Sequence, residues 1–185
     1  WQRQIIFVKD NQNPGDATYM VFRDIVTADH SSEWNVWTLA KPGTEKIADR
    51  TAVLEGQFGV DVLLAFYRKP RAPLTSLFHH HRTRSYIQMD QNQTRIQARA
   101  ETGGDYGVVL FPLRHSAEDS PSVKELESGA VEIRWATGRR HLIFLFPEVR
   151  EITQDGVTFK GRAGLVKFEN GKTTIVPLEC VRMTP

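Results

Sequence analysis

The residues best suited to chemistry gather in one stretch of the chain, from Val62 to Met89. The stretch holds no Asp or Glu and is dense in cations, imidazoles and rings: Arg68, Lys69, Arg71, Arg82, Arg84, His79, His80, His81, Phe66, Tyr67, Phe78 and Tyr86. Guanidinium groups bind carboxylates and sulfates through paired hydrogen bonds, and aromatic rings offer flat apolar faces. The stretch therefore predicts a surface for a polyanionic chain such as an acidic polysaccharide.

Within this stretch, we expect the four arginines Arg68, Arg71, Arg82 and Arg84 to hold carboxylate or sulfate groups, and Tyr67 to stack on a sugar ring. A plainer interpretation stays open, because charge runs on a protein surface are often only solvated. In that interpretation the stretch is an edge strand and a proline-containing loop with a basic outer face.

The tryptophans supply a second stacking candidate. Trp34, Trp37 and Trp135 all lie in apolar runs typical of strands. We expect Trp37 and Trp135 to pack in the core. Trp34, where exposed, would stack on a sugar face, although packing is the more common fate of such a ring.

Asp24 is the acidic residue whose position most needs an explanation. Alternation along a strand places Asp24 on the same face as Met20 and Phe22. A carboxylate on an apolar face costs several kcal/mol unless it is paired or bound to a metal. We therefore expect an arginine, an indole N–H, backbone amides or a cation beside Asp24, and a structural ion pair or a turn cap is the commoner arrangement.

The histidine triplet is a poor metal site. On a strand, His79 and His81 share one face and supply two ligands, whereas zinc takes three or four protein ligands. The positive charges of Arg82 and Arg84 also oppose a bound cation, so we predict no metal here. The chain carries neither a Gly-x-Ser-x-Gly turn nor a phosphate-binding loop, and Cys180 has no evident histidine partner. The sequence thus contains no self-contained catalytic motif.

Composition narrows the class of protein. The 185 residues carry 24 Lys and Arg against 22 Asp and Glu, a net charge of +2, which is too balanced for a dedicated nucleic-acid binder. With one cysteine, no internal disulfide can form. No apolar run approaches the roughly 20 residues of a membrane span. The chain shows no targeting segment and starts at Trp1 inside a predicted strand, so we expect a fragment of a longer protein.

Strand signals dominate the chain. Short runs rich in β-branched and aromatic residues recur between Gly, Pro, Asn and Asp. Eight of these runs are Arg3–Lys9, Tyr19–Val26, Trp34–Leu39, Thr51–Glu55, Gln57–Phe66, Arg84–Met89, Thr94–Ala100 and Tyr106–Leu113. We expect the last third to be a meander of hairpins, with Thr137-Gly138 between two of its runs. Asp155-Gly156 and Asn170-Gly171 predict tight hairpins, because both residues of such pairs readily adopt positive φ.

Together these signals predict an all-β protein, an antiparallel β-sandwich with a double sheet of about a dozen strands. Ser120 to Ser128 is the one segment expected to form a short helix, with Ser120 as its cap and Pro121 in its first turn. We expect a single domain over residues 1–185, with an internal loop at 116–128.

The order of these runs resembles a known family. RQIIFVKD, YMVFRDIV and WNVWTL resemble the opening of the β-sandwich region of heparinase II/III-like polysaccharide lyases, and YGVVLFP and GVTFKGRAGLVKFENGKTTIVPL resemble its later strands. The resemblance implies an upstream α/α-toroid catalytic domain, with an acidic polysaccharide in the cleft between the two. It also implies a bacterial protein located in the periplasm or outside the cell.

The resemblance further implies that this chain lacks the active site. The family's catalytic Tyr and His come mainly from the toroid and from a segment just before this region. Asp24 matches an Asp that helps to hold a structural zinc in several members, but the matching later His position holds Ala40, and the earlier one would lie upstream of Trp1. We therefore predict no zinc and no other cofactor, and a non-metal partner for Asp24.

Three functions remain open from the sequence. The first is a non-catalytic C-terminal sandwich domain that supports a lyase and contacts acidic polysaccharide. The second is a free-standing carbohydrate-binding module that uses Trp34 or Tyr67. The third is a structural domain whose basic stretch meets an acidic protein partner. In all three the chain alone is not expected to be an enzyme.

Overall fold

The computed structural model describes residues 1–9, 18–82, 90–114 and 120–184, with only the backbone described at 81, 82 and 90. These residues form an all-β structure whose paired strands are all antiparallel, as predicted. The chain divides into two compact units, Trp1–Ala117 and Glu118–Pro185, named unit 1 and unit 2 below. The expected single domain over the whole chain stays a prediction.

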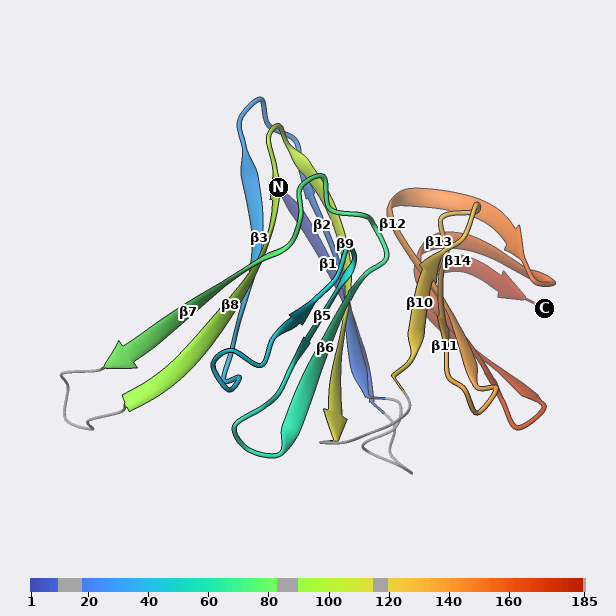
Figure 1. Ribbon diagram of the computed structural model, residues 1–185. Helices are drawn as coiled ribbons and strands as arrows, with labels where there is room; N and C mark the ends of the chain where they lie inside the picture. Colours follow the sequence, from blue (N-terminus) through green and yellow to red (C-terminus); the bar gives the residue numbers. More distant parts are fainter. Residues whose placement is uncertain (10–17, 83–89, 115–119, 185) are drawn as a thin grey trace. The chain divides into compact units, whose positions relative to one another are not determined.

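Unit 1 is a sandwich of two antiparallel sheets (Figure 1). The larger sheet has the strand order β1-β2-β9-β6-β5-β4, and the smaller one has the order β3-β8-β7. The strands are β1 (Gln2–Val8), β2 (Tyr19–Val26), β3 (Ser32–Thr38), β4 (Lys46–Ile47), β5 (Thr51–Leu54), β6 (Val60–Phe66), β7 (Thr75–Arg82), β8 (Asp90–Ala100) and β9 (Gly104–Arg114).

The core of unit 1 lies between the facing sides of the two sheets. Strand register aligns Phe22, Val108 and Phe66 across three strands of the larger sheet. Trp34 of the smaller sheet meets two of these side chains edge-on, with ring centroids 6.2 Å from Phe22 and 5.5 Å from Phe66. Ile96 of β8 is fully buried in the same cluster. These side chains belong to one cluster that packs the two layers together.

The larger sheet is apolar on both faces, which explains the continuous apolar runs in β6 and β9. On the face opposite to Val108, register aligns Val21, Val109 and Ala65, and all three are buried. A strand buried on both faces does not show polar alternation. The smaller sheet differs, because β3 and β8 alternate between core residues and polar or exposed residues, and the described side chains of β7 are all exposed.

The smaller sheet extends beyond β3 as a two-stranded ribbon (Figure 1). β3 pairs with β8 from Thr94 to Ala100, whereas β7 pairs with β8 from Asp90 to Gln97. β7 is thus an edge strand, which agrees with the plainer interpretation of the basic stretch. The predicted strand at 84–89 lies outside the described residues.

Unit 2 is a five-stranded meander in the order β10-β11-β12-β13-β14. Its strands are β10 (Ser122–Glu125), β11 (Val131–Arg134), β12 (Arg140–Gln154), β13 (Val157–Glu169) and β14 (Lys172–Thr184). Two of the predicted hairpins are two-residue turns with positive φ at both positions, Asp155-Gly156 between β12 and β13 and Asn170-Gly171 between β13 and β14. This is the backbone that Asx-Gly favours.

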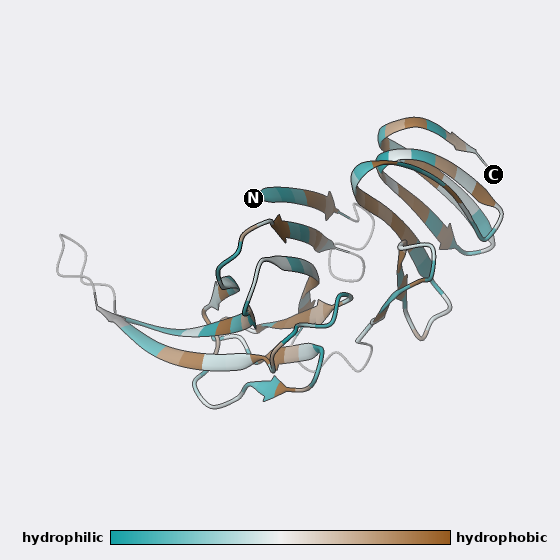
Figure 2. Ribbon diagram, turned by 90° about the horizontal axis from the view of Figure 1, so that it is seen from above, coloured by the Kyte–Doolittle hydropathy of each residue, from teal (hydrophilic) through white to brown (hydrophobic). Residues whose placement is uncertain are grey.

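The long strands of unit 2 bend so that one sheet encloses its own core. The register of β12 against β13 shifts between Leu145 and Arg150, and such a bulge turns the strand. As a result, Phe144 and Phe159 stack with centroids 4.6 Å apart and planes at 7°. In Figure 2, hydrophobic and hydrophilic residues are interspersed along these strands, as expected for a sheet with one buried face.

The predicted short helix at Ser120 to Ser128 is wrong, because part of this segment forms β10. Val123 lies opposite Ile133 of β11, and a turn with Gly129 at φ 82° joins the two strands. Strand pairing outweighs the helix-start signals of Ser120 and Pro121. The segment is too short for a stable isolated helix, and pairing with β11 satisfies the hydrogen-bonding groups of its backbone. The expected loop at 116–128 therefore contains a strand.

A buried histidine closes the core of unit 2. His141 is fully buried, its ring lies 4.9 Å from that of Trp135, and its Nε2 donates to Oε1 of Glu169 at 2.8 Å. Arg139 pairs with the same carboxylate at 3.2 Å. Burial lowers the pKa of His141, and this effect outweighs the opposing pull of Glu169. The imidazole is therefore held in its neutral form.

We expect unit 2 to lose stability as the solution becomes mildly acidic. The unfolded chain binds a proton at His141 near pH 6.5, whereas the folded chain binds it only at lower pH, so the free energy of unfolding falls as the pH drops below about 6.5. His141→Gln keeps a donor for Glu169 and should flatten this dependence. Urea unfolding of both chains between pH 7.5 and 5.5 measures it, and equal slopes would contradict the assignment.

Candidate functional site

The two aromatic residues predicted to stack on sugars are buried. Trp34 is 5% exposed and Tyr67 is 3% exposed. The hydroxyl of Tyr67 donates to the carbonyl of Phe22 at 3.1 Å, and its ring covers Gly107, where an added Cβ would lie 2.3 Å from the ring. Neither ring presents a face to solvent, so the predicted stacking role does not hold for Trp34 or Tyr67.

The predicted arginines of the basic stretch are largely used within the protein. Arg68 donates to Oδ2 of Asp105 at 2.8 Å, and Arg23 pairs with the same carboxylate at 3.2 Å. Arg71 donates to the carbonyl of Thr102 at 3.1 Å. The Arg82 side chain and the whole of Arg84 lie outside the described residues, so their roles stay predictions.

A different surface brings the candidate chemistry together, on the solvent side of the smaller sheet. We name it the outer face, and register places there Asn35 and Trp37 from β3, Gln91, Gln93, Arg95, Gln97 and Arg99 from β8, and Thr75, Leu77 and His79 from β7. Of these residues, His79 belongs to the histidine triplet of the basic stretch. Side chains two residues apart along a strand share one face. The register then aligns these side chains in rows that run across the three strands.

The central row of the outer face places a cation between two apolar side chains. Arg95 lies opposite Trp37 on one side and Leu77 on the other. Cζ of Arg95 is 5.6 Å from the indole centroid, and the ring of His79 meets the same indole edge-on at 5.9 Å. Trp37 is 48% exposed and Leu77 is 49% exposed. An open indole beside a guanidinium is thus available to a ligand.

Arg95 has unused hydrogen-bonding capacity. Its Nε is buried and has no hydrogen-bond partner, and Arg95 forms no ion pair within the part of the chain that the structure describes. A buried N–H without an acceptor is costly and uncommon in folded proteins. Because apolar neighbours exclude water, a charged hydrogen bond at this position would be stronger than at an open surface.

The next row is a hydrogen-bonded chain of polar side chains. Oγ1 of Thr75 donates to Oε1 of Gln97 at 3.3 Å, and Nε2 of Gln97 donates to Oδ1 of Asn35 at 3.3 Å. These contacts hold the amides across the sheet. Amides beside an exposed ring are groups that bind the hydroxyls and the apolar face of a sugar.

The prediction that Trp37 packs in the core is therefore wrong, and the sequence contains the signal that corrects it. Trp34 and Trp37 are an odd number of residues apart in one strand, so their side chains must point to opposite faces. The burial of Trp34 obliges Trp37 to lie outside. By the same rule, the two-residue spacing of Gln91, Gln93 and Arg95 indicates from the sequence that their side chains share one face.

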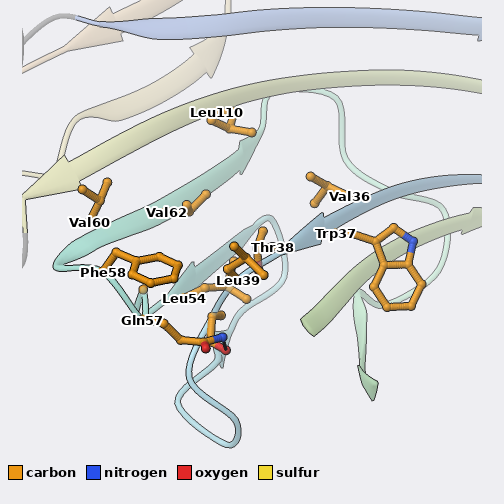
Figure 3. A pocket seen from close by; sticks show the side chains of 12 residues that line it. Val36, Trp37, Thr38, Leu39, Leu54, Gln57, Phe58, Val60, Val62 and Leu110 are labelled. Atoms are coloured by element: carbon orange, nitrogen blue, oxygen red, sulfur yellow. Dashed lines mark hydrogen bonds between the residues drawn. The ribbon is translucent and has the colours of Figure 1, made fainter. Parts of the chain in front are cut away.

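A cavity of about 330 Å³ opens between the two sheets of unit 1 (Figure 3). Its walls are mainly apolar, from Val36, Leu39, Leu54, Phe58, Val62 and Leu110. Figure 3 shows the ring of Trp37 at one side, apart from Leu39, Leu54 and Phe58. Nε2 of Gln57 already donates to the carbonyls of Ala40 and Asn92, at 2.9 and 2.8 Å. Because the Nε2 group of Gln57 is already engaged, the cavity suits an apolar group better than a sugar.

Asp24 is buried and paired with an arginine of the neighbouring strand. The carboxylate is 2% exposed, and it accepts hydrogen bonds from Nε and Nη2 of Arg3 at 2.6 and 2.9 Å. These bonds raise the pKa of Arg3. Ala40, which occupies the position where the resemblance would place a zinc ligand, lines the cavity instead. Within the described residues, no three His, Cys, Asp or Glu side chains are grouped to hold a metal.

No family model, curated protein or solved structure matches this chain in the comparisons with known proteins. The resemblance to heparinase II/III-like lyases therefore stays a prediction. The described residues include no helix that is long and apolar enough to cross a membrane.

We expect Arg3→Met to destabilise unit 1 by about 2–4 kcal/mol, because it leaves a buried carboxylate without its cation. The lower end is favoured, since the Arg3 side chain is 42% exposed and partly screened by water. Adding Asp24→Asn to Arg3→Met should recover part of the loss, because the amide carries no charge. Urea unfolding of the single and double variants measures both effects, and an Arg3→Met chain as stable as the parent would refute this role.

Proposed function

We propose that this chain is a non-catalytic β-sandwich domain of a polysaccharide lyase similar to the heparinase II/III-like enzymes, and that its outer face contacts an acidic polysaccharide. One observation carries the contact. The guanidinium of Arg95 lies beside the exposed ring of Trp37 and faces no carboxylate among the described residues. A sugar acid offers both of the missing partners, an apolar ring face and an anionic group.

The chemistry of recognition follows from the two side chains. The indole of Trp37 would pack on the C–H face of a sugar ring. The carboxylate of the same or the next sugar would accept paired hydrogen bonds from the terminal N–H groups of Arg95. Gln97 and Asn35 would bind hydroxyl groups. In this proposal catalysis belongs to an upstream α/α-toroid domain of the same protein, in the periplasm or outside the cell.

Two other functions remain as outcomes of the test. A free-standing carbohydrate-binding module would use the same outer face and would bind glycan without an upstream domain. A structural domain with an acidic protein partner would bind no glycan at any salt concentration. The arrangement of an open ring, amides and one cation favours a sugar over a purely ionic protein contact, which would need more unpaired cations.

We expect the isolated chain to bind a polyuronate such as alginate, and Trp37→Ala and Arg95→Ala each to weaken binding at least tenfold. A tenfold loss corresponds to about 1.4 kcal/mol. Calorimetric titration at two salt concentrations measures this, with weaker binding expected at high salt because one contact is ionic.

Two control variants sharpen the test. Arg50→Ala removes an exposed arginine next to β5, away from the outer face, and should leave affinity unchanged. The joint Arg68→Ala and Arg71→Ala change should also leave it nearly unchanged, because both side chains already have acceptors within the protein. Loss of binding in this pair with none in Trp37→Ala would return the site to the basic stretch. Absence of binding to any acidic polysaccharide would overturn the proposed function.

A further inference from the structure

The outer side of β8 carries a regular row of hydrogen-bond donors. Gln91, Gln93, Arg95 and Gln97 alternate with residues of the other face, of which Thr94 and Ile96 are fully buried. Consecutive members of the row are two residues apart, about 6.7 Å along a strand. The row therefore extends over about 20 Å, and every member can donate to an oxygen.

Acidic residues lie at the Arg99 end of the row. Glu33 lies opposite Arg99 in the register of β3 and β8, and Glu101 approaches the guanidinium of Arg99 to 3.9 Å. Between Gln97 and Gln91, no carboxylate lies on the outer face among the side chains that the structure describes. An anionic ligand would thus begin at Gln97 and run along β8 towards Gln91.

Strand pairing holds the backbone that carries the row. β8 is paired on both sides at Gln97 and Arg95, by β3 and β7, and its pairing with β7 continues past Gln91. Gln97 is oriented by Thr75 and Asn35, and its contact with Asn35 uses one of its two N–H groups. A line of donors on a fixed backbone is complementary to a linear chain of acceptors. A single sugar would use only Trp37 and Arg95.

The charge of the row is low. Amides outnumber the guanidinium, so the row offers many neutral donors and few cations. A densely sulfated chain is bound through many cations, whereas a polymer of sugar acids presents mostly hydroxyls with a carboxylate on each sugar. The composition of the row matches the second kind of chain.

On the basis of the proposed function, we infer that the outer face binds the interior of an unsulfated uronate polymer, laid along β8 from Gln97 to Gln91. Trp37 and Arg95 hold one sugar acid firmly. Gln93 and Gln91 extend the contact over the neighbouring sugars. The site is thus specific for a length of chain as well as for a charge.

A length series tests this inference on the chain as it exists. Calorimetric titration with oligouronates from dimer to octamer should show affinity rising at least tenfold with length, up to the length that spans about 20 Å, and then levelling off. A heparin oligomer of matched length should bind at least tenfold more weakly than the oligouronate.

Gln93→Ala separates a true extended site from a statistical gain of longer chains. It should lower affinity for long oligomers at least threefold and leave the dimer unchanged, whereas Trp37→Ala should weaken every length. Equal affinity for dimer and octamer, or an unchanged length dependence in Gln93→Ala, would overturn the extended site and leave the proposed function standing. Tighter binding of heparin would overturn the preference for carboxylates. Failure of all oligomers and polymers to bind would overturn the proposed function itself.

Discussion

The edge-on packing of Trp34 against Phe22 and Phe66 is the contact on which the arrangement of unit 1 depends. It anchors β3 to the larger sheet and decides which side of the smaller sheet is buried. Since β3 pairs with β8 in regular register, the same choice orients every side chain of β8. The outer face is therefore a geometric consequence of the core, and Trp37 and Arg95 point away from the core because Trp34 and Ile96 point into it.

Much of the fold was predictable from local patterns. Asp155-Gly156 and Asn170-Gly171 specify their turns through backbone conformations that few other residues adopt, so both hairpins could be predicted from two letters each. The segment around Val123 could not, because its cap signals are local while its strand pairing depends on β11, and tertiary context overrides a weak helical propensity. The exposure of Trp37 could be predicted only in part, because it follows from alternation once Trp34 is known to be buried.

The candidate site was harder to predict because charge in a sequence does not say whether it is already used. Arg68 belongs to the most basic stretch of the chain, yet Asp105, far away in sequence, accepts its hydrogen bond. Arg3 and Asp24 likewise satisfy each other across two strands. Arg95 lies in a polar run without the other cations and rings of the basic stretch, yet its guanidinium faces no carboxylate among the described residues. Long-range pairing, which composition cannot reveal, separates these cases.

The alternation along β8 has a consequence for how such a domain can change over evolutionary time. Its inward residues, such as Ile96 and Ala98, are tied to the core, whereas its outward residues contact neighbouring side chains of the outer face, such as Trp37 and Asn35. Exchanges at the outward positions would alter which polymer the face holds while costing the fold little. One scaffold could then be diversified towards different glycans by replacing every second residue of a single strand.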